Sequence, residues 1–372
     1  RDRGLTMPLV SLRLEGWGYG SFAIGVMAST PAVGVLLGAM ISGRLAARFG
    51  TPRLMRLCLI SGAFSVGLLA LLQSYPIWLV LRLLIGVQLT VVFILGESWI
   101  NQLAIEKWRG RLVALYGTGY ALSQLSGPVL LTFIGTADNR GFWFSVCLLV
   151  GGSLLLLGRT GAPKVDPHSA NGRGLFAFCA QLPAIAWAVV LFAGFEAMIL
   201  TLLPVYGVQQ GFTQAVALAM VSTVVVGDAL LQLPIGWLAD RISRQTLFKG
   251  CGIVLFASSL AMPLLLQHIA IWPVLVLFGA SAGGLFTLSL ILIGERYRDD
   301  VLVRANAHIA QLWGLGCLIG PLTTGAVSQW ISGHALPLVM ALGAAGFVVL
   351  VSYRGLPPVT QAADGGLQQE RS

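Results

Sequence analysis

The feature that most constrains this chain is a series of apolar runs, each about 20 residues long, that recurs over its whole length. A helix of that length crosses the apolar core of a bilayer, which is about 30 Å thick. None of the runs alternates with a period of two residues, and an open sheet cannot satisfy its backbone hydrogen bonds in lipid. We therefore predict an all-α polytopic membrane protein. Its spans are expected at 20–42, 55–73, 77–104, 111–134, 141–158, 183–207, 213–236, 248–268, 270–293, 305–328 and 334–352, with residues 4–14 as the tail of one more.

The basic charge of the chain follows its topology. Only 10% of the residues are charged, and the net charge is +9. Lys and Arg follow every second apolar run, whereas the loops "LQSYPIW", "VQQGFTQ", "LQHIAIW" and "QWISGHA" contain none. Membrane proteins place such basic loops in the cytoplasm. We therefore expect a multi-pass protein of a bacterial inner membrane with a cytoplasmic C-terminus, and no binding of nucleic acid.

The chain contains an internal repeat with an offset of 193 residues. "GRLAARFGTPR" begins at 43 and "GWLADRISRQ" at 236, and the same offset relates Gly127-Pro128 to Gly320-Pro321. This predicts twelve spans in two parallel six-helix halves, since an even number of spans per half preserves orientation. The expected boundaries are 1–158 for the first half, 159–182 for a cytoplasmic linker, 183–353 for the second half and 354–372 for a cytoplasmic tail.

The span at 183–207 is the second-half equivalent of the first helix. Subtracting the same offset from its first residue places the start of the first helix about ten residues before Arg1. The chain also lacks an initiator Met. We therefore expect a truncated first helix, with truncation favoured over a gene fragment. The offset pairs Arg3 with Glu196.

Two parallel six-helix halves, each with a G-x-L-a-D-R-x-x-R-like phrase after its second span, resemble the major facilitator superfamily over essentially the whole chain. Arg82-x-x-x-Gly86 resembles the arginine motif of its fourth helix. The wording of "LPVYGVQQGFT", "LQLPIGWLAD" and "NAHIAQLWGLGCLIGP" is similar to its YcaD-like branch. The glycine-proline pairs resemble the superfamily's helix bends, which favour export; they are Gly127, Pro128, Gly320 and Pro321.

Ionisable residues inside the apolar runs are candidates for function, because each costs at least about 2.5–3.5 kcal/mol to insert. Arg82 and Glu97 share a helix face about 22 Å apart, too far to pair directly. Glu196 lies near the centre of its helix and can carry protons if protonation and solute binding compete for it. The alternatives are interfacial anchoring for Arg82, a pair with a loop arginine for Glu97, and a permanently protonated, hydrogen-bonded acid for Glu196.

Other candidates are less central. Asp228, near the middle of the next helix, has the same two interpretations as Glu196. The resemblance implies that helices one, four, seven and ten line the central cavity, which adds Asp2 and Arg3 to the proton or solute pathway. The mixed charges of this set favour a polar or zwitterionic solute. Further candidates for the cavity lining are Tyr116, Tyr120, Gln124 and His308. For the tyrosines, helix packing is the alternative; for His308, a polar contact with a loop residue such as Glu295 is favoured over a proton relay.

The repeated loop phrase predicts a cytoplasmic gate. An aspartate is suited to a helix N-terminus, and the resemblance implies a helix of the opposite half. For Asp240 this is the helix that begins near Arg111. The first copy has Ala47 at the equivalent position and offers no carboxylate, so the latch is expected to be one-sided. The alternative is that both phrases only set topology. The predicted gate residues are Asp240, Arg241, Arg244, Arg111, Arg48 and Arg304.

These patterns indicate a monomeric secondary active transporter that moves a small organic solute by alternating access, coupled to protons, with export favoured. No GxxxxGK[ST] motif for ATP and no nucleophile–base pair for an enzyme occurs, and no CxxC or His/Cys cluster indicates a metal or cofactor. The alternative is a non-transporting membrane sensor or assembly partner that keeps the fold.

Overall fold

A computed structural model describes residues 3–103, 126–136, 138–157, 173–239, 241–297 and 299–354, and this part of the chain is helical without strands. The first half contains a helix at 126–134 and the labelled helices α1 (Arg3–Gly16), α2 (Ser21–Phe49), α3 (Thr51–Leu71), α4 (Tyr75–Leu103) and α6 (Arg140–Leu155). The second half contains α8 (Pro183–Gln209), α9 (Gln214–Ala239), α10 (Arg244–Leu265), α11 (Ile271–Arg296), α12 (Asp299–Trp330) and α13 (Ala335–Arg354).

The predicted spans that lie in the described residues correspond to these helices, with ends that differ by up to seven residues, as at 42 against Phe49; residues 111–125 of the 111–134 span lie outside the described part. The all-helical membrane architecture is confirmed. By length and composition alone, seven helices in the described part are candidates to cross a membrane. Two more, α6 and the Gln214–Leu230 part of α9, are apolar but shorter. The domain boundaries stay a prediction. One helix was missed: α7 (Arg173–Gln181) lies within the expected linker.

The internal repeat is visible in the way that the helices touch. A β-carbon on Gly34 of α2 would overlap the carbonyl oxygen of Leu83 on α4. A β-carbon on Gly227 of α9 would likewise overlap the carbonyl oxygen of Val276 on α11. Both residues of the second pair are offset by 193 from those of the first. Small residues allow membrane helices to approach through their backbones, so both halves use one packing scheme.

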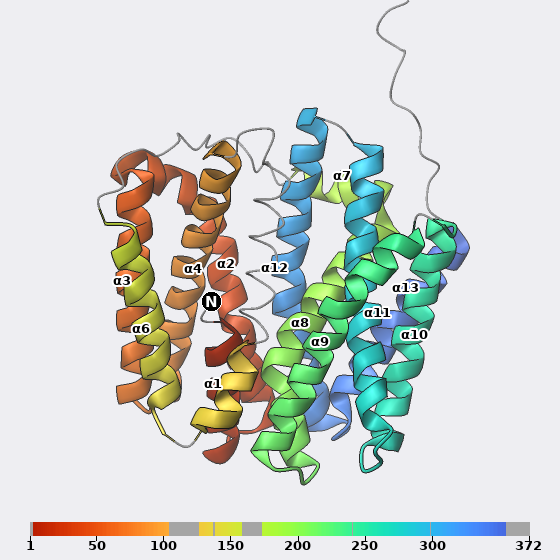
Figure 1. Cartoon of the computed structure of the whole chain (residues 1–372), viewed down its shortest axis with the longest axis horizontal. Helices are drawn as coiled ribbons and strands as arrows, with labels where there is room; N and C mark the ends of the chain where they lie inside the picture. The colour runs from red at the N-terminus through yellow and green to blue at the C-terminus, as the bar shows by residue number, and fades with distance from the viewer. Residues whose placement is uncertain are drawn as a thin grey trace, which may run out of the picture.

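The two halves lie side by side, with α1 to α6 on one side and α8 to α13 on the other (Figure 1). We call the end with the 49–51 and 241–243 turns the basic end, and the end with the 72–74 and 210–213 turns the neutral end. Helix α7 lies at the basic end. Helix α8 is buried over most of its length. Outer helices expose large apolar side chains such as Phe64 and Leu264, as expected where lipid is the solvent.

Candidate solute site and gates

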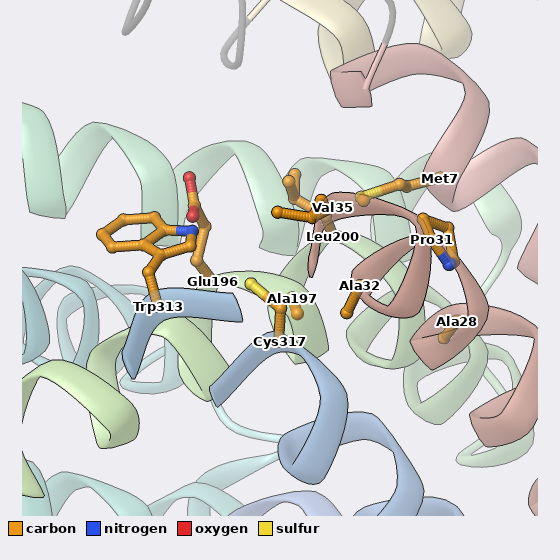
Figure 2. Close-up of a pocket in the computed structure, with 10 residues that line it drawn as sticks. All are labelled: Met7, Ala28, Pro31, Ala32, Val35, Glu196, Ala197, Leu200, Trp313 and Cys317. Atoms are coloured by element: carbon orange, nitrogen blue, oxygen red, sulfur yellow. The ribbon is translucent and has the colours of Figure 1, made fainter. Parts of the chain in front are cut away.

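A cavity lies at the interface of the two halves, between α1 and α2 of the first and α8 and α12 of the second (Figure 2). Its empty volume is about 440 Å³, including space open to solvent. The residues that line it are Met7, Ala28, Pro31, Ala32, Val35, Glu196, Ala197, Leu200, Trp313 and Cys317. Helices from both halves therefore contribute to one concave and mainly apolar site, which is the usual character of a small-molecule pocket.

Glu196 is the sequence-predicted residue that the structure places in this cavity. Glu196 and Trp313 both line the cavity, from α8 and α12 respectively, and Figure 2 draws them at the same end of it. Trp313 belongs to an aromatic cluster: its ring centroid is 5.4 Å from that of Phe192 and 4.9 Å from that of Phe286. The Phe192 and Phe286 rings are stacked with centroids 4.9 Å apart. Phe192 precedes Glu196 by one helical turn, so the carboxyl group and the cluster share a face of α8.

Asp228 does not line this cavity. Its Oδ1 atom lies against Gly283, so that a β-carbon there would overlap it. A β-carbon on Gly279 would lie 3.0 Å from the backbone nitrogen of Asp228. Asp228 is therefore packed in the contact between α9 and α11, where the absence of a side chain on Gly283 makes room for the carboxyl group. This position fits the interhelical interpretation better than the pathway interpretation.

The other predicted pathway residues are not brought to the cavity by the described part of the structure. Arg82 is 2% exposed on α4 and is not among the residues that line the cavity. Glu97 and Arg3 lie on α4 and α1, but their side chains are outside the described part, as is Asp2. Tyr116, Tyr120 and Gln124 also lie outside the described residues. Of the mixed-charge set expected from the sequence, Glu196 is the member that lies in the described lining of the cavity.

His308 contacts the linker helix rather than Glu295. Its ring centroid lies 5.4 Å from that of Phe178 on α7, and its Nδ1 lies 3.1 Å from Oε1 of Gln311. A β-carbon on Gly174 of α7 would lie 2.9 Å from its Nε2. Glu295 instead forms an ion pair with Arg244. His308 therefore helps to dock α7 on α12 and lies away from the cavity. The apolar residues of "RGLFAFCAQ" were a sequence signal for this helix.

Contacts join the two halves from mid-depth to the neutral end. At the neutral end, a β-carbon on Gly25 of α2 would lie 3.0 Å from Cα of Gly325 on α12, and one on Gly325 would lie 2.7 Å from the carbonyl oxygen of Ser21. We call Gly25 and Gly325 the glycine seam. One helical turn from the seam towards mid-depth, the Ser29 hydroxyl donates to the carbonyl oxygen of Leu318 at 2.9 Å. The halves therefore touch backbone to backbone at this end.

Polar groups at the ends of α1 and α8 extend this closure. The Nε2 of Gln209 donates to both carboxyl oxygens of Glu15, at 3.2 and 3.1 Å. Thr136 donates to Gln214 between the same two halves. Burial raises the pKa of Glu15, and the hydrogen bond from Gln209 acts in the opposite direction. Sequence reasoning missed Glu15 and Gln209, although the repeat offset brings their positions within one residue of equivalence.

At the basic end, the described arginines of the second loop phrase make contacts within their own half. Arg241 lies over the ring of Trp237 at 3.7 Å from the centroid, and Arg244 pairs with Glu295 at the end of α11. In the first copy, Arg48 lies over the ring of Phe49. Asp240 and Arg111 lie outside the described residues, as does the side chain of Arg304.

The glycine-proline pair of α12 lies at a close helix contact. A β-carbon on Gly320 would lie 2.7 Å from Cα of Gly194 on α8, and one on Gly316 would overlap the carbonyl oxygen of Val190. Pro321 lies inside α12, where it removes one backbone hydrogen bond. Gly127 and Pro128 are buried in the 126–134 helix. The glycines of α12 thus set its distance from α8, on which Glu196 lies two residues after Gly194.

Known proteins resemble this chain over most of its length. A model of the Major Facilitator Superfamily matches residues 2–227 and again residues 215–371. The uncharacterized MFS-type transporter YfkF of Bacillus subtilis is 22% identical over 343 residues, which cover 88% of this chain and 85% of that protein. The uncharacterized MFS-type transporter YcaD of Escherichia fergusonii is 25% identical over 337 residues, which cover 90% of this chain and 87% of that protein. The resemblance inferred from the motifs is confirmed.

Solved structures share the fold. A D-xylose–proton symporter superposes with a TM-score of 0.73 at 16% identity, over 96% of both chains. The nucleoside transporter NupG superposes with a TM-score of 0.73 at 15% identity, over 94% of this chain and 93% of that one. A bacterial homolog of the human lysosomal transporter Spinster, in an inward-facing and occupied conformation, also gives 0.73, at 12% identity over 94% and 93%. At these identities the likeness establishes the fold alone.

Proposed function

Because the chain belongs to the Major Facilitator Superfamily, we propose that it is a secondary active transporter that carries a small organic solute by alternating access, coupled to protons. The position of Glu196 carries this proposal. Its carboxyl group lines a cavity to which both halves contribute, at the place where an alternating-access transporter holds its solute. The family and the fold support solute transport, and Glu196 supports the proton coupling.

Coupling follows from competition for one carboxylate. A proton on Glu196 removes the charge that a solute can pair with, and a bound solute that pairs with the charge excludes the proton. Ionisable groups inside membrane proteins serve proton relays for this reason. Movement of the halves then exposes the same group to one side of the membrane while it holds a proton and to the other while it holds the solute.

The contacts at the neutral end support a rocking movement of the halves. They join α1 and α2 to α8 and α12 through the glycine seam and through the Glu15–Gln209 hydrogen bonds, and they must separate for the neutral end to open. We propose that closure of the basic end replaces them with a latch formed by Asp240 at the helix near Arg111, with Arg241 and Arg244 beside it. The first copy, with Ala47, has no equivalent acid.

The distribution of basic residues supports a cytoplasmic basic end and a cytoplasmic C-terminus. The bacterial relatives support an inner-membrane location. The glycine-proline pair of α12 supports export as the direction. Because one chain supplies both walls of the cavity, we propose that the monomer is the working unit.

The test uses liposomes that contain the purified protein and a pH-sensitive dye inside. Each member of a panel of metabolites and drugs is added outside, and solute-dependent proton movement is recorded. We expect at least one solute to drive proton movement with the wild-type protein and with Asp138→Asn, which alters an exposed surface pair with Arg140. We expect Glu196→Gln to abolish it. Unchanged proton movement in Glu196→Gln would show that the coupling group lies elsewhere.

A further inference from the structure

We propose that four arginines at the basic end of the first half bind the phosphate group of an anionic phospholipid. They are Arg44 and Arg48 near the end of α2 and Arg53 and Arg56 near the start of α3, and we call them the arginine cluster. The inference concerns the outer surface of the protein, so it is independent of the solute cavity and of the proposed function. It is supported by the unbalanced charge of the cluster, by a comparison with the second half and by the apolar surface beside the cluster.

A tight turn brings the arginine cluster together. Helix α2 ends at Phe49 and α3 begins at Thr51, and Gly50 between them has a φ of 76°, a conformation that favours glycine. The four arginines lie within six residues of Gly50 in the sequence, which is about 9 Å along either helix. Like charges at this spacing repel one another, so an anion bound among them is stabilised.

The described part of the protein does not balance this charge. The sequence has no Asp or Glu between Glu15 and Glu97. Within the described residues, none of the four arginines forms an ion pair. The Nε of Arg56 is buried there without a hydrogen-bond partner, and the other three arginines are exposed. A negative group from outside the chain is therefore the natural partner of the cluster.

The second half has acids where the first half has none. Asp240 stands at the position equivalent to Ala47, with the repeat offset of 193. Glu295 stands at the position equivalent to Gln102, and it forms an ion pair with Arg244. The second loop phrase is thus supplied with negative charge by its own half, whereas both acids are missing from the first half.

The net charge of the two copies differs accordingly. Residues 43–56 contain the four arginines of the cluster and no acid, a charge of +4. The equivalent residues 236–249 contain the three cations Arg241, Arg244 and Lys249, and with Asp240 and Glu295 their charge is 3 − 2 = +1. The first copy therefore has the stronger attraction for an anion, although the two copies have the same place in the repeat.

The surface beside the cluster favours a lipid over a soluble anion. On α3, Arg53 shares a helix face with Leu57, Ile60 and Phe64, which follow it by four, seven and eleven residues. These three apolar side chains are 54%, 55% and 68% exposed. Helix α3 lies at the outer edge of the first half (Figure 1). A phospholipid whose phosphate group is bound at the cluster can therefore lay its acyl chains along this face.

The test measures which lipid lies beside α3. Full-length protein with a fluorescent amino acid in place of Ile60 is inserted into phosphatidylcholine nanodiscs that contain a minor fraction of brominated phosphatidylglycerol or brominated phosphatidylcholine. Quenching gives the ratio of the association constants of the two brominated lipids. The matched control carries the same label in place of Ile253, the repeat equivalent of Ile60, which is 47% exposed.

At position 60 we expect a preference for the anionic lipid of at least about fivefold, which corresponds to about 1 kcal/mol. At position 253 the preference should be at least about threefold smaller. High salt should reduce the preference at position 60, because exposed charges are screened. An equal preference at the two positions would overturn the proposal.

Variants locate the site. Arg44→Gln combined with Arg53→Gln removes two cations whose repeat equivalents are uncharged, and it should lower the preference at position 60 at least about threefold. Ala47→Asp, which introduces the acid of the second copy, should lower it too. Arg354→Gln, which removes an exposed charge at the end of α13, should leave it unchanged.

Two results would contradict the assignment. The first is a preference that persists in the double variant, with thermal unfolding as the check that the variant is folded. The second is loss of the wild-type preference on addition of millimolar glycerol phosphate at constant ionic strength, which would show that the cluster takes a soluble phosphate instead of a lipid. Since quenching records lipid contact without transport, neither result depends on whether solute drives proton movement in liposomes.

Discussion

Replacing Gly25 by alanine tests whether the contact of Gly25 with Gly325 is part of a gate or is only ordinary helix packing. The added β-carbon would lie 2.6 Å from the carbonyl oxygen of Pro321 and 3.0 Å from Cα of Gly325. Both are backbone atoms of α12, in the opposite half, and neither can rotate away. Carbon–oxygen contacts of the weakest favourable kind begin at about 3.3 Å, so α2 and α12 must move apart by about 0.7 Å at this point.

The size of the effect follows from the cost of overpacking, which is about 1–3 kcal/mol for an extra methyl group in a well-packed site. This cost falls on the state in which the neutral end is closed, because separation of the halves relieves the contact. A difference of that size lowers the population of the closed neutral end about 5- to 150-fold relative to the open one.

The assay is a pair of distance measurements with spin labels introduced by nonsense suppression, so that the native cysteines stay in place. Labels at Gln73 and Thr213 report the neutral end, and labels at Arg53 and Gln245 report the basic end; all four positions are exposed. We expect Gly25→Ala to lengthen the first distance and to shorten the second, since the ends open in alternation.

Two alanine substitutions serve as controls. Gly34→Ala produces a clash of the same kind within the first half, where its β-carbon would lie 2.8 Å from the backbone nitrogen of Val87. It should lower thermal stability without moving either distance. Gly151→Ala places its β-carbon where nothing lies within 4 Å and should change neither property. If Gly25→Ala lowers stability as Gly34→Ala does and leaves both distances unchanged, the neutral-end seam is not a gate.

Three further changes test other parts of the account. Burial raises the pKa of Glu15 in the closed neutral end, so protonation of Glu15 stabilises that closed state. The stabilisation is complete at pH values below the ordinary pKa of Glu, and it is lost as the pH rises through the raised pKa. Glu15→Gln should keep a side chain that can bond to Gln209 and should remove this pH dependence from the neutral-end distance; an unaltered pH profile would contradict it. Gly283→Ala, whose β-carbon would overlap Oδ1 of Asp228, should destabilise the protein by about 1–3 kcal/mol in thermal unfolding yet leave solute-dependent proton movement in liposomes intact. Asp240→Asn should weaken closure of the basic end and lengthen its distance, and a distance equal to that of the wild type would argue against the latch.

The fold was predictable because it depends on properties that a sequence states directly. Apolar runs long enough to span a bilayer located the helices, and the offset of 193 predicted a repeat that recurs in the Gly34–Leu83 and Gly227–Val276 contacts. Helix α7 was missed because nine residues in a polar segment fall short of any membrane-span criterion.

The site was predictable only in part. Glu196 was found because an acid in the middle of an apolar run is costly and therefore conspicuous. Asp228 carries the same signal, but its side chain faces α11, and the direction of a side chain around a buried helix leaves no trace in a uniformly apolar sequence. Trp313 was a weaker signal: it stands in the middle of an apolar run, away from the ends where tryptophans anchor in the interface. The Glu15–Gln209 contact joins residues 194 apart in sequence and needed the assembled halves.

The link between proton and solute at Glu196 is tested most directly by accumulation against a gradient. Liposomes are given a pH gradient of fixed size, and the uptake of a transported solute is followed before and after the gradient is collapsed. The account predicts that the wild-type protein and Asp138→Asn accumulate the solute and release it on collapse, whereas folded Glu196→Gln does neither. Accumulation by Glu196→Gln to the wild-type level would contradict it.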